Sequence, residues 1–183
     1  MPNWCANGIT LRHEDPAMIQ RAAKAFQEGK FLQEFIPCPA ELLETVAQMG
    51  TNDAEKANRD KYGYSSWYDF NVANWGTKWD VESSNVEIED ANTVTAGFDS
   101  AWAPPIRAYE QLMDLGFDLV AFYYEPGMQF VGKWDNGSDY CVEYGGQTSE
   151  TVRDMIGEEL DDYFAISENM AEWEAENAEE DQE

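Results

Sequence analysis

The sequence predicts an α+β fold with a mainly antiparallel β-sheet. Three observations lead to this class. Several β-forming segments meet through short turns rich in glycine, asparagine and proline, which favours hairpins. Two helices with clear apolar stripes separate these segments and can cover one face of a sheet. Hydrophobic residues make up 43% of the 183-residue chain and aromatic residues 14%, which is enough to bury a core.

The first two elements are a strand and a helix. Residues 4–13 alternate loosely between apolar and polar and indicate the strand. Asp15 and Pro16 then supply an N-cap and a first helical position, and the helix ends before Gly29. Residues 31–36 are apolar and form either a short strand or a segment that packs under the helix.

The next part of the chain predicts two helices around a loop. Residues 41–48 form a short helix after a Pro-Cys-Pro break. Residues 49–63 are polar and charged and are expected to form a surface loop. A helix then begins at the N-cap Ser66, with Asp69 three residues later, and ends at Gly76.

The second half of the chain predicts strands and a clear amphipathic helix. This helix opens at Pro104-Pro105 and closes at Gly116. Turns at Glu125-Pro126-Gly127 and Asp135-Asn136-Gly137 join consecutive strands. The expected strands are 77–88, 93–101, 117–124, 128–134 and 140–144.

This order of elements predicts a split βαβ, ferredoxin-like arrangement over residues 1–146, with helices on one face of the sheet. Residues 147–183 form a separate acidic C-terminal helix and tail in this prediction. The segment from Ser149 to about Phe164 is expected to be one amphipathic helix with a narrow apolar stripe. The last residues are expected to fray.

The charge is the most unusual property of the chain. Asp and Glu number 37 against 11 Lys and Arg, which gives a formal net charge of −26. Residues 148–183 contribute 14 acids and one base, Arg153, and residues 79–106 carry six acids and no base. Repulsion among so many like charges destabilises the compact state. The acidity therefore indicates a function or a habitat of the protein and not a requirement for folding. It also argues against direct binding to nucleic acid or to an anionic membrane.

Two interpretations of this acidity stay open. The first is a solvated surface that serves solubility, as in a halophile. The second is a surface that imitates the phosphate backbone and occupies a basic, nucleic-acid-binding protein. In the second interpretation the partner-binding acids are Glu150, Asp154, Glu158, Asp161, Asp162, Glu82, Glu87, Glu89 and Asp90.

A Trp-rich segment offers a different kind of site. Trp75, Lys78, Trp79 and Trp102 could line a pocket in which a planar ligand stacks on the rings. The same residues could instead belong to the core, with indole N–H groups bonded to backbone oxygens. Lys78 is the base that is expected to meet a ligand or an ion pair there.

No catalytic residue, metal site or cofactor is predicted. The single histidine, His13, provides neither a catalytic triad nor a set of metal ligands. Cys5, Cys38 and Cys141 are scattered without a Cys-x-x-Cys pair, which is typical of reduced thiols. The chain is therefore interpreted as a protein without enzyme activity.

A set of short motifs occurs within about the first 145 residues. In chain order they are Met1–Asn7, Phe35–Pro37 with Pro39, Glu41-Leu42, Trp75–Asp80, Phe98–Pro105, and Glu125–Gly127 with Phe130 and Gly132. This set resembles the YubB-like and Api-like proteins of phages and plasmids. The resemblance implies a ferredoxin-like α+β domain without an iron–sulfur cluster, and an origin in a mobile element. It implies no particular activity, and it does not extend to the acidic segment after Gly146.

These observations lead to a preferred function and two alternatives. The preferred function is that of a phage- or plasmid-encoded accessory protein that inhibits a basic host nucleic-acid-binding or defence protein by nucleic-acid mimicry. The alternatives are a small-ligand or nucleotide-binding module that uses the Trp-rich segment, and an enzyme built on the same pocket. No apolar stretch approaches the roughly 20 residues that span a bilayer, and no signal pattern opens the sequence. A cytoplasmic location in the host cell is therefore expected.

Overall fold

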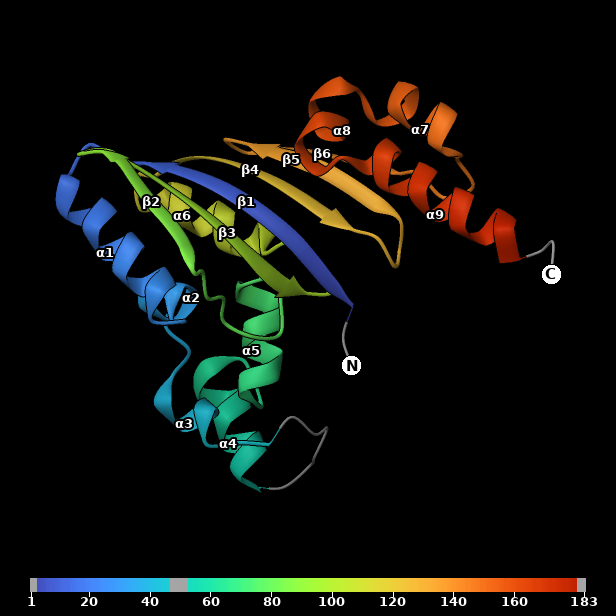
Figure 1. The fold of residues 1–183 in the computed structure, drawn as a ribbon. Helices are drawn as coiled ribbons and strands as arrows, with labels where there is room; N and C mark the ends of the chain where they lie inside the picture. The colour runs from blue at the N-terminus through green and yellow to red at the C-terminus, as the bar shows by residue number, and fades with distance from the viewer. Residues whose placement is uncertain (1–2, 47–52, 181–183) are drawn as a thin grey trace.

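One antiparallel sheet forms the centre of the structure, a computed structural model that describes residues 3–46 and 53–180 (Figure 1). Its strand order is β2-β3-β1-β4-β5-β6, and every neighbouring pair is antiparallel. This arrangement confirms the α+β class and the antiparallel sheet. The strands are β1 (Trp4–Arg12), β2 (Asn85–Asp90), β3 (Thr93–Ala101), β4 (Asp118–Glu125), β5 (Phe130–Asp135) and β6 (Ser138–Glu143).

Helices connect β1 to β2 and β3 to β4, and three more follow β6. Two predicted N-caps are confirmed, because Asp15 accepts the N–H of Ala17 at 2.9 Å and Ser66 accepts the N–H of Asp69 at 3.3 Å. Within the described ranges, no helix has both the length and the apolar character that crossing a membrane requires. The helices are α1 (Pro16–Gln27), α2 (Phe31–Phe35), α3 (Ala40–Leu43), α4 (Asp53–Tyr62), α5 (Trp67–Asn74), α6 (Ile106–Asp114), α7 (Ser149–Ile156), α8 (Glu158–Phe164) and α9 (Ile166–Glu180).

The larger hydrophobic core lies between one face of the sheet and the helices α1, α2 and α6. Strand β1 contributes Ile9 and Leu11 to this core, two residues apart, as the alternation of a strand requires. Phe26 of α1 stacks on Phe31 of α2 with ring centroids 3.7 Å apart. The two helical connections before β4 therefore cover the same face of the sheet.

A second hydrophobic cluster lies on the opposite face, under α7, α8 and α9 (Figure 1). Strand β4 serves both cores, because Leu119 and Ala121 face the first while Phe122 and Tyr124 face the second. Val131 of β5 is fully buried in the second cluster. The prediction of helices on one face is thus correct only for the helices that precede β4.

The predicted single helix over residues 149–164 is wrong. Gly157 has φ +88° and ψ 156°, a conformation that glycine adopts and other residues avoid, and it separates α7 from α8. Ala165 adopts a left-handed conformation with φ +52° and separates α8 from α9. The segment therefore folds back on itself as three helices, and α7 and α9 lie side by side. The predicted boundary at residue 146 falls between β6 and α7.

Two local predictions also need correction, and one open alternative is decided. Residues 31–35 form helix α2, which packs against α1 and is not a strand; the half-buried carboxylate of Asp80 accepts the N–H groups of Leu32 and Gln33 in its first turn. Residues 53–62 of the predicted loop are helical, and residues 49–52 lie outside the described ranges. Strand β2 begins only at Asn85, because the preceding segment is bonded elsewhere, to α2 through Asp80 and to β3 through Thr77.

Candidate acidic interaction surface

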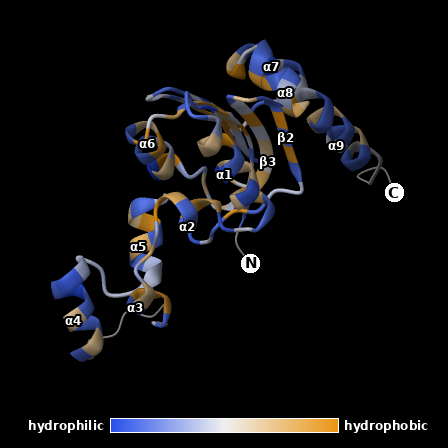
Figure 2. Ribbon diagram, turned by 90° about the vertical axis from the view of Figure 1, so that its left-hand side faces the viewer, coloured by the Kyte–Doolittle hydropathy of each residue, from blue (hydrophilic) through white to orange (hydrophobic). Residues whose placement is uncertain are grey.

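The C-terminal helices present carboxylates on ordered backbone. Glu150 and Asp154 lie one turn apart on α7 and are exposed. On α8 the side chain of Glu158 is 85% exposed and that of Asp162 is 67% exposed. The ribbon of α7 in Figure 2 carries both hydrophilic and hydrophobic stretches, as expected for a helix with one exposed and one buried side. Because Gly157 turns the chain between the helices, these four carboxylates do not form the single row that the sequence suggested.

Asp161 does not belong to this surface. Its side chain is 2% exposed and accepts hydrogen bonds from the Ser167 N–H and Oγ–H, each at 2.7 Å. Arg153 donates a third hydrogen bond at 2.7 Å. Burial opposes ionisation of Asp161, but the bonds from Ser167 and Arg153 outweigh burial and hold its pKa below the ordinary value. Asp161 therefore fixes the turn from α8 to α9 instead of meeting a partner.

Arg153, the base in this acidic segment, is occupied by the protein itself. Its guanidinium lies 2.7 Å from Asp161, 2.8 Å from Asp162 and 3.8 Å from Glu158. The hydrogen bonds to Asp162 and Asp161 raise its pKa. Lys133 of β5 is paired in the same way with Glu159 at 2.8 Å. Arg153 and Lys133 thus reduce the local negative charge, but neither they nor any other base in residues 3–46 and 53–180 forms an ion pair with Glu150 or Asp154.

The acids around β2 are also exposed, at the opposite edge of the sheet. Glu82 precedes the strand, while Glu87, Glu89 and Asp90 lie on it. Asp90 accepts the N–H of Asn92 at 2.7 Å and so shapes the turn into β3. Since β2 and β6 are the two edge strands, the acids of β2 and those of α7 and α8 belong to different regions of the molecule.

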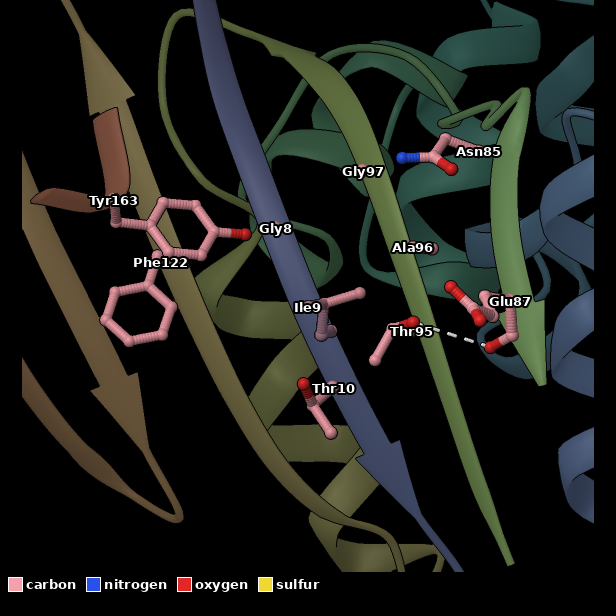
Figure 3. A pocket seen from close by; sticks show the side chains of 10 residues that line it. All are labelled: Gly8, Ile9, Thr10, Asn85, Glu87, Thr95, Ala96, Gly97, Phe122 and Tyr163. Atoms are coloured by element: carbon pink, nitrogen blue, oxygen red, sulfur yellow. Dashed lines mark hydrogen bonds between the residues drawn. The ribbon is translucent and has the colours of Figure 1, made fainter. Parts of the chain in front are cut away.

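A groove on the open face of the sheet lies between these two regions (Figure 3). It has a volume of about 310 Å³, and small residues of β1 and β3 form its floor. Glu87 lies on one side, and Tyr163 of α8 stacks on Phe122 on the other, with ring centroids 4.5 Å apart. The hydroxyl of Tyr163 lies over Gly8, where a Cβ would meet it at 1.8 Å. The groove therefore has one acidic and one aromatic wall.

The Trp-rich segment divides between core and surface. Trp75 is 3% exposed, and its indole N–H donates to the Ile36 carbonyl at 2.9 Å, so it is a core residue. Trp79 and Trp102 are 38% and 41% exposed. The Lys78 ammonium lies 4.4 Å from the Trp79 ring centroid and 5.5 Å from that of Trp102. The structure thus brings together three of the four predicted residues, as a cation–π cluster on the surface.

The cysteines show no activation. Burial raises the pKa of Cys5 to about 12 and that of Cys38 to about 11, so both thiols stay protonated at neutral pH. Burial also raises the pKa of the exposed Cys141. In the part of the chain that the structure describes, no group of three or more His, Cys, Asp or Glu side chains is placed to hold a metal ion.

Comparison with known proteins adds a loose structural likeness. No protein-family model and no curated protein matches the chain. The crystal structure of the protein Api92 from Yersinia pseudotuberculosis, which carries the family label DUF1281, is similar to it with a TM-score of 0.40. The likeness covers 80% of this chain and 99% of Api92, with 12% identical residues. At this level it carries no inference about function.

Two features of the C-terminal region are not predicted by the sequence. Tyr163 and Phe122 form the aromatic wall of the groove, yet neither was singled out. A signal for Phe122 was present, because β4 carries apolar or aromatic residues on both of its faces, which is typical of a strand covered on both sides. The sequence gives no comparable signal for the structural role of Asp161. That role depends on contacts with Ser167 and Arg153, which only the folding of α7, α8 and α9 brings to the Asp161 side chain.

Proposed function

We propose that this protein binds a basic, nucleic-acid-binding partner protein through its exposed carboxylates and inhibits that partner by taking the place of nucleic acid. The observation that carries the proposal is the set of exposed acids on ordered helices, two of which, Glu150 and Asp154, form no ion pair with any described residue. Glu150 and Asp154 stand on α7, and the nearest base, Arg153, is turned toward α8. Fixed carboxylates can imitate phosphates only on a scaffold that holds their spacing.

The spacing on these helices suits this role. Carboxylates three or four residues apart on a helix have Cβ atoms about 5–6 Å apart, a separation of several ångströms like that between phosphates on one strand. The acids of β2, led by Glu87, extend the negative surface across the groove toward a second contact region. Long-range attraction would make association fast and strongly dependent on salt.

The scaffold of the proposed surface is a split βαβ, ferredoxin-like core. We base this on the order β2-β3-β1-β4, the antiparallel pairing, and two helical connections that cover one face. Strands β5 and β6 and helices α7–α9 are additions to that core. An accessory role in a phage or plasmid accords with the motifs shared with YubB-like and Api-like proteins.

Charge reversal tests the proposal. The variant Glu150→Lys, Asp154→Lys, Glu158→Lys should lose capture of a basic protein from host lysate, while its melting temperature stays close to that of the parent. The matched control reverses three exposed acids elsewhere, Glu14, Glu44 and Asp114, and changes the net charge equally. If both variants lose capture equally, the partner responds to the total charge of the protein and not to this surface. If the first variant, reversed at Glu150, Asp154 and Glu158, still captures the partner, the proposal is refuted.

A second candidate function rests on Lys78. Across residues 3–46 and 53–180, no carboxylate forms an ion pair with its ammonium, although the chain is strongly acidic. A planar anionic ligand could stack on Trp79 or Trp102 and place its charge on Lys78. Quenching of tryptophan fluorescence by a nucleotide, lost in Lys78→Gln, would support this function, and unchanged fluorescence would exclude it.

A further inference from the structure

A second cavity lies between α9 and the end of the sheet, and it shares no lining residue with the groove described above. Its volume is about 420 Å³. Three aromatic side chains line it, Tyr124 of β4, Tyr144 after β6 and Trp173 of α9. The amide side chains of Gln129, Gln147 and Asn169 also line it. The cavity thus combines π faces with carbonyl oxygens that can accept hydrogen bonds.

The aromatic part of the cavity is held in place by the fold. The rings of Tyr124 and Tyr144 have centroids 6.3 Å apart at an angle of 25°, and their hydroxyls are 3.3 Å apart. Tyr144 is 3% exposed, whereas Trp173 is 65% exposed. Two tyrosines therefore form a fixed inner wall, and Trp173 forms the outer edge that a ligand would pass.

The electrostatics of this cavity favour a cation. Glu174 is the charged residue among those that line it, and neither Lys nor Arg is among them. Its carboxylate accepts the Ser149 N–H at 2.9 Å and the Ser149 hydroxyl at 2.6 Å. The hydrogen bonds from Ser149 lower the pKa of Glu174, so it stays ionised at neutral pH. Negative charge and aromatic faces together form the usual environment of a bound organic cation.

We propose that this cavity binds the guanidinium group of an arginine side chain. The source of the arginine rests on the proposed function, in which the partner is a basic protein. The flat guanidinium can stack on Tyr124 or Trp173 while its N–H groups donate to the amide oxygens and to Glu174. Lysine fits less well, because its ammonium is compact, strongly hydrated and unable to stack. The cavity would anchor one arginine while the helical acids attract the partner.

Small arginine probes test the inference directly. We expect N-acetyl-arginine amide to shift the Trp173 indole N–H resonance saturably in NMR at moderate salt, with the resonance identified by Trp173→Phe. N-acetyl-lysine amide should bind about ten-fold more weakly. Trp173→Ala should weaken arginine binding by a similar factor. Because this variant lacks the Trp173 indole, its binding is measured from the NMR shifts of the side-chain amides of Gln129 and Gln147. Because Trp173 is mostly exposed, this variant should fold normally.

Controls separate the cavity from the charged surface. Tyr140→Ala removes another exposed aromatic residue, 56% exposed on β6, and should leave arginine binding unchanged. Non-saturable shifts, equal binding of the lysine probe, or full binding by Trp173→Ala would overturn the inference. The triple reversal at Glu150, Asp154 and Glu158 should still bind the arginine probe, since none of these residues lines the cavity. If that variant also still captures its partner, the proposed function fails while the cavity stands.

Discussion

At the scale of single residues, Asp161 shows that an acid in an acidic segment can be structural. It is buried and receives hydrogen bonds from Ser167 and Arg153, while Asp162 beside it stays mostly exposed. The composition of the segment does not distinguish the two. The distinction depends on which side of the short helix α8 faces the α9 N-terminus, and that is decided by tertiary packing.

Replacing Asp161 by Asn should lower stability in a pH-dependent way. The folded-state pKa of Asp161 lies below its ordinary value of 3.8, so its contribution is present above that pH and is lost as the pH falls through the folded pKa. The loss at neutral pH should be about 1.5–3 kcal/mol, as for hydrogen bonds to charged groups. Thermal melts of both proteins should show a gap in Tm at pH 6 that narrows below pH 3.8. A gap independent of pH would contradict this account.

Gly132 is a residue whose small size the packing requires. A Cβ there would lie 2.3 Å from the Tyr123 hydroxyl and 2.5 Å from the Tyr140 carbonyl oxygen, which is backbone and cannot move aside. Gly132→Ala should therefore cost about 1–3 kcal/mol in chemical denaturation, as overpacking does. Gly97→Ala is the matched control on β3, because its Cβ would meet only the Asn7 carbonyl at 3.8 Å. Equal effects of the two changes would rule out the steric explanation.

At the scale of elements, local signals decided what the sequence could predict. Helices α1 and α5 were expected because Asp15 and Ser66 cap them through neighbours in the chain. For residues 31–36 the sequence does not decide between a strand and another packed segment, since the backbone N–H of Leu32 at the start of α2 is satisfied by Asp80 from a distant part of the chain. The Trp-rich site was predicted in part, since Lys78 does meet aromatic rings, but burial of Trp75 follows only from its bond to Ile36. The arginine cavity had no sequence signal, because its walls come from three separate elements.

The break between α7 and α8 depends on one glycine. Gly157 has φ +88° and ψ 156°, and no atom would obstruct a Cβ there, so an alanine would suffer backbone strain alone. Gly157→Ala should cost about 1–3 kcal/mol, the usual cost of such a conformation for other residues. Chemical denaturation measures this loss, and hydrogen exchange should show faster opening of α7 and α8 than of β1. Unchanged stability would mean that the break does not need glycine.

At the scale of the whole molecule, the charge of −26 governs which partners can approach. Within the ranges that the structure describes, six bases form ion pairs, and Lys133 and Arg153 near the C-terminal helices are among them. The groove and the arginine cavity each have a carboxylate in their lining. Both hollows therefore favour cationic groups over anionic ones.

The protein should not bind duplex DNA or RNA. Binding to a duplex depends on the release of counterions by bases that contact phosphates, and neither hollow on the acidic side offers such a base. A gel shift at about 150 mM salt, where surface charges still act over about 8 Å, should show no complex. A complex that forms at this salt would contradict both the charge argument and the proposed mimicry.

The burial of both faces of β4 has a consequence for how this chain can change over generations. The segment that carries the acids also covers Phe122, Tyr124 and Val131 with the apolar sides of α7, α8 and α9. A deletion that removed the acids would leave these side chains in water and invite aggregation. Descendants of this gene can therefore lose or redirect their negative charge one codon at a time, but they cannot discard the segment that bears it.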